Sequence, residues 1–436
     1  MNRIISLLLF FPLAVCAQET YNLKRCLEVG LERNYEIRIV RNEQQIADNN
    51  TTKGNAGFLP TLDLSTGYSG SINNVNQHST DGTKSAYNNI HNRTANAGIN
   101  LNWTAFDGFQ IQANYDRLKE VQGVGELNTR LSIEDFIAGF SAEYYNYVRQ
   151  KIRLGNLRYA VELSKERLRI IGARYNIGSM SRLDYQQARV DFNADSSNLI
   201  KQYEVVYTSR VRLNQLMALD DISQNLAVSD SLIEFNPLLD KVEIWNKMLR
   251  ANSSLLLSVK EKRISELDYK AIKSRDYPYL KINAGYGYTR NMYGMGSPDK
   301  QQTLGLNYGL TLGFNIFDGF NRKREQKNAR LQIQNKELRY EQLELGLKAD
   351  LSNIWMAYEN NMELTNLEKE NLQTAKINYS IAIERYKLGD LSGVELREAQ
   401  NSLLEAEERL LQAQYNTKLC EISLLQISGQ IVNYLE

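Results

Sequence analysis

The chain has 436 residues, a formal net charge of +1 and a mean hydropathy of −0.46. The 52 Lys and Arg residues are balanced by 51 Asp and Glu residues, so no cationic excess points to nucleic-acid binding. The absence of a long apolar run after the first residues argues against a helical membrane protein. Neither value excludes transmembrane strands, because such strands alternate apolar and polar residues and average out in hydropathy.

Residues 1–17 are predicted to form a secretory signal peptide. Asn2-Arg3 supplies positive charge, residues 4–15 are apolar, and Val15-Cys16-Ala17 resembles a cleavage site before Gln18. The apolar stretch is too short for a transmembrane helix. Cys16 raises the alternative of a lipoprotein signal, but Val15 stands where such signals usually have Gly, Ala or Ser. Ordinary export with cleavage is the preferred interpretation.

A first structural repeat is expected over residues 18–219, as helix, strand, strand, long helix, turn and helix. The leading helix is expected at 23–52 and the strands at 58–70 and 96–106, where apolar residues alternate with small or polar ones. The Asn-, Ser- and Thr-rich segment between the strands, 71–96, is predicted to be a solvated outer loop. It contains His78 and His91, but no carboxylate framework accompanies them, so a metal site is disfavoured.

The expected helices agree in length. The long helix, about 108–173, would measure roughly 100 Å, and the return helix, 181–216, roughly 55 Å. The leading helix would add roughly 45 Å, so the two shorter helices laid end to end match the long one. Residues 220–240 would form an equatorial connector where the short helices meet.

A second structural repeat, 241–436, is predicted to have the same order of elements. Its helices are expected at 242–275, 319–384 and 391–425, and its strands at 278–291 and 303–317. Apolar side chains alternate strictly with small or polar ones along the last strand, at Leu304, Leu306, Tyr308, Leu310, Leu312, Phe314 and Ile316. Strands of about ten residues cross a bilayer when tilted. A half-buried sheet in a soluble domain is the alternative, but the sequence offers no second layer to cover it.

The two repeats keep a constant spacing. Phe106-Asp107-Gly108-Phe109 recurs as Phe317-Asp318-Gly319-Phe320, an offset of 211 residues (317 − 106). Arg174-Tyr175-Asn176-Ile177-Gly178 recurs as Arg385-Tyr386-Lys387-Leu388-Gly389 at the same offset (385 − 174). Upstream, Leu31 and Asn34 pair with Leu249 and Asn252 at an offset of 218 (252 − 34). A duplication that preserves length indicates one structural unit used twice.

Other patterns bear on packing and chemistry. The second return helix has 3-4 spacing of Leu and Ala from Leu396 to Ala413, typical of a coiled-coil seam, whereas the first has Asp195 and Gln202 at matching positions. Cys26 and Cys420 are interpreted as small buried residues, with a disulfide as the less favoured alternative. The chain has no glycine-rich phosphate loop and no zinc-ligand spacing, so neither an enzyme nor a cofactor is expected.

Nearly the whole mature chain resembles the TolC-like outer membrane efflux proteins, the channel-tunnel family. The duplication, the Phe-Asp-Gly-Phe start of each long helix and the run from Arg385 to Leu396 carry the resemblance. Phe109 and Phe320 depart from the family, which often has a second Gly at those positions. The resemblance implies a mixed α and β fold with four transmembrane strands per protomer. A homotrimer would close a twelve-stranded barrel in outer-membrane lipid, and the helices would form a coiled-coil tunnel in the periplasm.

The resemblance also implies functional residues. The helix turns at Gly178, Ser179, Met180, Ser181 and at Gly389, Asp390, Leu391, Ser392 are expected to dock a periplasmic adaptor, the membrane fusion protein. Glu395 and Glu398, with Asp184 from the first repeat, are expected to form an acidic ring at the periplasmic entrance; a solvated helix face is the alternative.

Passive export is the expected function, with an inner-membrane transporter supplying the energy and no nucleic acid involved. Efflux of drugs or metals and type I protein secretion both remain open. A soluble periplasmic coiled-coil scaffold is the alternative from another class, but it leaves the strand pairs unexplained.

Overall fold

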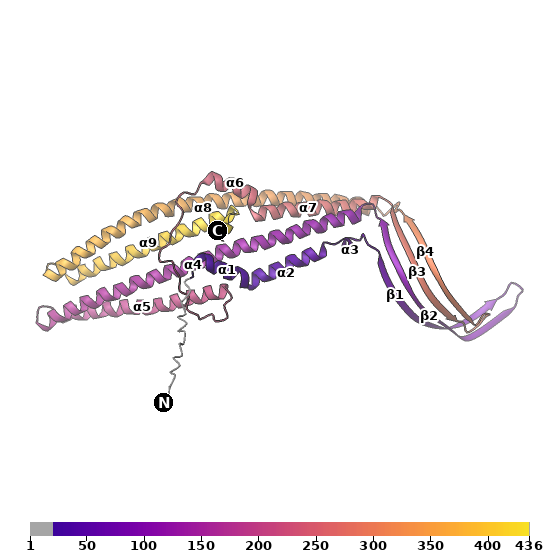
Figure 1. Cartoon of the computed structure of the whole chain (residues 1–436), viewed down its shortest axis with the longest axis horizontal. Coiled ribbons are helices and arrows are strands. Elements are labelled where there is room, and N and C mark those ends of the chain that lie inside the picture. The colour runs from indigo at the N-terminus through magenta and orange to yellow at the C-terminus, as the bar shows by residue number, and fades with distance from the viewer. Residues whose placement is uncertain (1–20, 436) are drawn as a thin grey trace, which may run out of the picture. The chain divides into compact units, whose positions relative to one another are not determined.

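The computed structural model describes residues 21–435, so the predicted signal peptide and Cys16 lie outside the described residues. The elements follow one order twice (Figure 1). The first repeat has α1 (Leu23–Arg33), α2 (Tyr35–Asn50), α3 (Lys53–Ala56), β1 (Thr61–His78), β2 (Lys84–Phe106), α4 (Gln110–Asn176) and α5 (Arg182–Leu216). The second has α6 (Lys241–Ala251), α7 (Ser253–Lys273), η1 (Ser274–Asp276), β3 (Tyr279–Met292), β4 (Lys300–Gly313), α8 (Asn321–Leu388), α9 (Gly393–Ile427) and η2 (Ile431–Leu435). None of the described helices combines the length and apolarity needed to span a membrane.

Contacts divide the chain into two compact units that cut across the sequence repeats. Among the described residues, unit 1 contains 21–41, 129–253 and 344–435, and unit 2 contains Asn42–Asn128 and Ser254–Leu343. Each unit therefore takes segments from both repeats. In unit 2 the physical reason is strand pairing, because β2 of the first repeat pairs with β3 of the second.

Unit 2 holds one four-stranded antiparallel sheet in the order β1-β2-β3-β4. The first hairpin is longer than the sequence predicts: β1 runs to His78 and β2 starts at Lys84, so the expectation of a loop over 71–96 was wrong. The prediction failed because this part of the hairpin is polar. Its residues are mostly exposed, so its strands lack the alternation of apolar and polar residues from which a strand is predicted. A register shift between Asn73 and Val75 marks the irregular part of this hairpin.

The second hairpin is shorter than expected at its last strand. β4 ends at Gly313, whose partner Tyr279 is the first residue of β3. Residues 314–317, predicted as strand, therefore have no β3 partner to pair with.

The alternation of residues gives the sheet two unlike faces. One face carries apolar residues in register across the strands, such as Leu64, Ile99, Tyr286 and Leu306. The opposite face carries Ser, Asn, Thr and Gly, including the neighbouring Gly98 and Gly287, where an added Cβ would meet backbone atoms at 3.1–3.3 Å.

The two long helices begin with the same unusual backbone. Gly108 and Phe109 have φ values of 69° and 73°, and Gly319 and Phe320 have values of 68° and 62°. Positive φ favours glycine, which gives a reason why the family that the sequence resembles often has Gly at the two Phe positions. Each Phe packs edge-on against the Phe three residues before it, with ring centroids 5.2 Å apart in the first repeat and 5.3 Å apart in the second.

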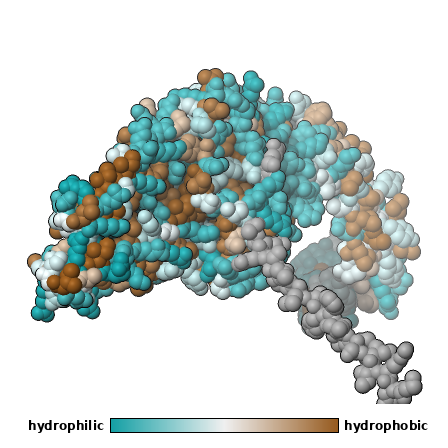
Figure 2. All heavy atoms as spheres, turned by 60° about the vertical axis from the view of Figure 1, so that its left-hand side comes forward, coloured by the Kyte–Doolittle hydropathy of each residue, from teal (hydrophilic) through white to brown (hydrophobic). Residues whose placement is uncertain are grey.

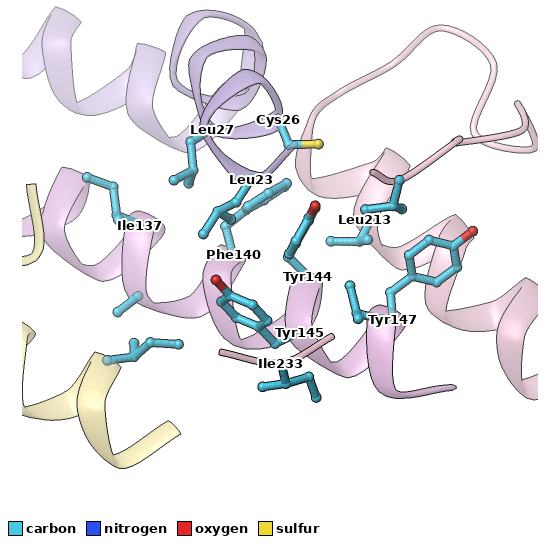
Figure 3. Packing of buried hydrophobic residues seen from close by; sticks show 14 of the residues in the cluster. Leu23, Cys26, Leu27, Ile137, Phe140, Tyr144, Tyr145, Tyr147, Leu213 and Ile233 are labelled. Carbon is cyan, nitrogen blue, oxygen red and sulfur yellow. The ribbon is translucent and has the colours of Figure 1, made fainter. Parts of the chain in front are cut away.

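The core of unit 1 forms where α1 and the end of α5 pack on α4. Figure 3 shows Leu23 and Leu27 of α1 meeting Phe140 and Tyr144 of α4, and the cluster also includes Leu213 and Ile233. Residues 220–240 pack on this core as an irregular connector: the hydroxyl of Tyr147 donates to the carbonyl oxygen of Leu226 at 3.3 Å. The 3₁₀ helix η2 also lies against α1.

In each repeat, an asparagine links the broken leading helix to the end of the return helix. The predicted leading helix is broken in each, after Arg33 and after Ala251, and an asparagine stands at each break. The side-chain amide of Asn34 donates to the carbonyl oxygen of Leu216 at 3.0 Å, and Asn252 donates to that of Ile427 at 2.9 Å. Both acceptors are last residues of return helices, so the asparagines that recur in sequence satisfy otherwise unpaired carbonyls at helix ends.

Candidate functional site: the helix turns of unit 1

The turns that join α4 to α5 and α8 to α9 have the same construction. Gly178 (φ 78°) and Gly389 (φ 94°) end the long helices in the left-handed conformation that glycine tolerates. The Ser179 amide donates to the Arg174 carbonyl oxygen at 2.9 Å, and the Asp390 amide donates to that of Arg385 at 3.0 Å. These bonds pair carbonyl groups that helix termination would otherwise leave free.

The residue after each turn caps the return helix. Ser181 and Asp184 form a capping box at the start of α5, and Ser392 and Glu395 form one at the start of α9. The Glu395 carboxylate accepts from the Ser392 amide at 2.9 Å and from its hydroxyl at 2.7 Å. The sequence analysis missed this motif, although Ser-x-x-Asp and Ser-x-x-Glu before an apolar stretch are its signature.

Capping changes the electrostatics of one predicted entrance residue. Hydrogen bonds from the Ser392 amide and then from its hydroxyl hold the pKa of the exposed Glu395 carboxyl below its usual range. Glu395 thus remains ionised to lower pH than an ordinary glutamate. The same bonds tie its carboxylate to the turn.

The other two predicted carboxylates line one cavity. Asp184 and Glu398 border a cavity of about 460 Å³ between α5 and α9, together with Met180 and Arg397. Glu395 does not border this cavity. The structure thus brings Asp184 and Glu398 to one cavity and places Glu395 outside it.

The predicted docking residues are mostly exposed. Gly178, Ser179 and Ser181 of the first turn and Gly389, Asp390 and Ser392 of the second are exposed. Met180 and Leu391 instead pack partly buried against the hydrophobic cluster formed by residues such as Ile171, Tyr386 and Leu396. Those two side chains help to hold the turns on the helices.

Four exposed apolar residues flank the turns at equivalent positions. Ile177 and Leu388 precede the glycines and are 81% and 79% exposed. Leu183 and Val394 follow the capping serines and are 76% and 75% exposed. Each pair is separated by the 211-residue offset (388 − 177; 394 − 183). Figure 2 shows hydrophobic residues on the surface of the helices. The sequence analysis passed over these residues, although the repeat alignment pairs them.

Polar contacts join the two helical hairpins close to the turns. The Arg174 guanidinium donates to the carbonyl oxygens of Tyr386 and Lys387 at 3.1 and 2.9 Å. Farther along, Arg397 of α9 holds the buried Asp195 of α5 through bonds of 2.6 and 2.8 Å. The hydrogen bonds that Arg397 donates to Asp195 raise the pKa of Arg397.

Buried polar groups from α4 complete this network. The Ser164 hydroxyl donates to Asp195, and the Gln400 amide donates to the Ser164 oxygen at 3.0 Å. Arg167 and Asp191 form a neighbouring ion pair. The sequence identified Asp195 only as a polar residue at a coiled-coil seam position. Its partner Arg397 was not predicted, because the two residues are far apart in the sequence.

In the part of the chain that the structure describes, the cysteines and histidines are not grouped into a metal site. Cys26 and Cys420 are both free thiols. Within residues 21–435 no group of three or more His, Cys, Asp or Glu residues is arranged to hold a metal ion, and His78 and His91 lie in strands.

The family model for outer membrane efflux proteins matches this chain twice, over residues 27–219 and 246–430. The two matched segments correspond closely to the two repeats. A comparison with curated protein sequences finds no match.

Solved structures share the fold at low sequence identity. The Campylobacter jejuni CmeC outer membrane channel is 17% identical with a TM-score of 0.79, covering 94% of this chain and 85% of that one. The outer membrane protein VceC from Vibrio cholerae is 15% identical with a TM-score of 0.72, covering 93% and 96%. The open state of the Neisseria gonorrhoeae MtrE outer membrane channel is 15% identical with a TM-score of 0.73, covering 93% and 88%. With most of its length matched by the family model, the chain belongs to the outer membrane efflux protein family.

Proposed function

We propose that this protein is the passive exit duct of a tripartite efflux or secretion system. A periplasmic adaptor and an inner-membrane transporter would load the duct and supply the energy. The observation that carries the proposal, beside family membership, is the four-stranded sheet with one exposed apolar face and two free edge strands.

The free edges argue that several copies assemble, and membership of the outer membrane efflux protein family favours a homotrimer. Among the described residues, strands β1 and β4 each pair with only one neighbouring strand, so each leaves a row of backbone groups without a partner strand. Such an edge cannot face lipid, and the smallest transmembrane barrels have eight strands. Three copies of the sheet would close a twelve-stranded barrel with the apolar face toward lipid and the Asn-, Ser-, Thr- and Gly-rich face toward the lumen.

The entrance of the duct would lie at the helix turns, where Glu395, Glu398 and Asp184 supply negative charge. Three copies would place these carboxylates around one axis. Like charges at close range repel one another and attract cations, and a low-dielectric wall strengthens both effects. The ring should therefore favour cations over anions and bind multivalent cations.

Single-channel recording in planar bilayers tests the ring. Because Glu395 caps α9 and Asp184 caps α5, the more informative variant is Glu398→Gln alone. We expect its reversal potential in a salt gradient to move toward that of an unselective pore, and block by a multivalent cation to weaken. Glu359→Gln, in the middle of α8, is the control and should behave as wild type. Unchanged selectivity and block in Glu398→Gln would show that this carboxylate lies only on a solvated helix face.

The turns themselves would dock the adaptor. Each hairpin presents exposed backbone at its glycine turn and two exposed apolar residues beside it, Ile177 with Leu183 and Leu388 with Val394. Apolar anchors surrounded by polar groups are the usual composition of a protein interface.

Site-directed crosslinking in cells tests the docking. Cysteines at Ser179 and Asp390, which are exposed, should crosslink to the adaptor, and cysteines at Asp221 and Ser231 in the connector should not. Crosslinks from the connector alone would refute docking at the turns.

A further inference from the structure

Three cationic side chains lie together on the apolar face of the sheet. Arg93 of β2 and Lys300 of β4 are in register on either side of Met292 in β3. Arg290 precedes Met292 by two residues and so lies on the same face, diagonal to both cations. Diagonal neighbours are about 7–8 Å apart, within reach of long side chains. Arg93, Arg290 and Lys300 are called the basic patch below.

The basic patch begins where the apolar residues end. From Leu280 to Tyr288 this face of β3 is apolar, a distance of about 27 Å along the strand, close to the band of about 25 Å that faces lipid in outer-membrane barrels. The patch lies past Tyr288, on the side of the hairpin connections at 79–83 and 293–299. At the opposite end of the same face, Leu280 pairs with Leu312, and no cation is present in that row.

Within the described chain, no carboxylate neutralises the patch. No ion pair joins Arg93, Arg290 or Lys300 to an acidic residue among residues 21–435, and the Nε of Arg290 is buried without a hydrogen-bond partner. The strands and their connections contain three acidic residues, and none of them forms an ion pair with the patch. Asp63 lies on the polar face. Asp81 accepts from Thr83 in the first hairpin connection, and Asp299 is in the second.

We propose that the basic patch binds phosphate groups of lipid headgroups in the outer leaflet of the outer membrane. The inference rests on the proposed function: with the sheet in outer-membrane lipid and the helices in the periplasm, the hairpin connections, which lie at the strand ends away from the helices, face outside. Guanidinium groups match phosphate oxygens in geometry, and uncompensated cations at headgroup depth attract anionic lipids. The adjoining apolar rows, with Tyr288 and Leu304, provide a surface for acyl chains. A lipid phosphate therefore fits better than free phosphate, which would gain nothing from that surface.

Native mass spectrometry of the detergent-solubilised protein measures the binding. The probes are a bisphosphorylated glycolipid, the same glycolipid without phosphates, and inorganic phosphate. The test variant combines Arg93→Gln, Arg290→Gln and Lys300→Gln. Lys281→Gln removes a cation from the opposite face of β3 and serves as the control. It is matched with Arg290→Gln, which removes one cation from the basic patch on the same strand.

Wild type and Lys281→Gln should bind the bisphosphorylated glycolipid about 100-fold more tightly than the triple variant does, with Arg290→Gln between them. The glycolipid without phosphates should bind all variants alike, and inorganic phosphate should not displace the phosphorylated one. Equal binding by wild type and the triple variant overturns the proposal. Effective displacement by inorganic phosphate overturns the assignment to lipid.

Channel recording separates this inference from the proposed function. Wild type that conducts but shows no preference for the phosphorylated glycolipid refutes the basic patch alone. Wild type that forms no channel refutes the proposed function, whatever the lipid measurement gives. The triple variant should still conduct, since its substitutions lie outside the entrance, and this result verifies that it is folded.

Discussion

The two helical hairpins, α4–α5 and α8–α9, share their turns but differ along their seams. Positions 211 residues apart keep the glycine, the capping serine and the capping carboxylate. The seam of α9 has buried Ala406 and Ala413 where α5 has buried Asp195 and Gln202. Residues that determine the backbone at the turns are thus retained in both copies, whereas residues between helices have diverged.

The divergence makes the two hairpins complementary. Asp195 of the first hairpin accepts from Arg397 of the second, and Arg174 of the first donates to the end of α8. The equivalent of Arg174 in the second hairpin, Arg385, reaches only its own turn, at the Asp390 carbonyl oxygen 3.4 Å away. The Asp195–Arg397 contact therefore depends on side chains that only one copy carries, whereas the contact of Arg174 depends on the surroundings of an arginine that both copies carry.

Breaking the Asp195–Arg397 pair should have the largest effect on this arrangement. Asp195→Ala leaves a partly buried guanidinium without its partner, and we expect it to lower the free energy of unfolding by about 3 kcal/mol. Urea unfolding of the detergent-solubilised protein, followed by circular dichroism, measures the change. Adding Arg397→Leu should recover much of the loss, because no buried charge then remains unpaired. A double variant less stable than Asp195→Ala would contradict this account.

The two equivalent arginines should differ in their importance. Arg174→Gln removes two charge-assisted bonds to the other hairpin and should cost about 2 kcal/mol, while Arg385→Gln should cost less than about 0.5 kcal/mol. The same unfolding measurement compares them. Equal losses would indicate that the hairpins are held together symmetrically.

The capping boxes should give small and nearly equal effects. Ser181→Ala and Ser392→Ala each remove one N-cap and should each lower the free energy of unfolding by about 1 kcal/mol.

The contribution of the Ser392 cap to stability should also depend on pH. Because the pKa of Glu395 is lowered in the folded protein, its contribution is present above the ordinary glutamate pKa and is lost as pH falls through the lowered value. The stability difference between wild type and Ser392→Ala should shrink below about pH 4. A difference that stays constant down to that range and below would show that the carboxylate takes no part in the cap.

Much of this fold could be predicted from the sequence because local sequence patterns determine it and each of these patterns occurs twice. Period-two alternation revealed the strands, and constant offsets revealed Gly108 with Gly319 and Asn34 with Asn252. The offset predicted that the two asparagines are equivalent. The structure shows that each one donates a hydrogen bond to the last carbonyl group of a return helix.

The errors and omissions have physical reasons. The polar ribbon from Ser71 to Asn96 lacks an apolar face, so alternation could not reveal it as strand. The Asp195–Arg397 pair joins residues from different repeats, and no spacing rule connects them. Of the entrance residues, the capping role of Glu395 was readable from Ser392-x-x-Glu395, whereas the shared cavity of Asp184 and Glu398 required the packing of α5 against α9.

The central claim is that four strands per chain become a closed barrel only when three chains assemble. Mass measurement of the detergent-extracted complex, combined with conductance in planar bilayers, tests it most directly. The account predicts a trimer that requires detergent and forms discrete channels. A monodisperse monomer that stays soluble without detergent and forms no channels would contradict it.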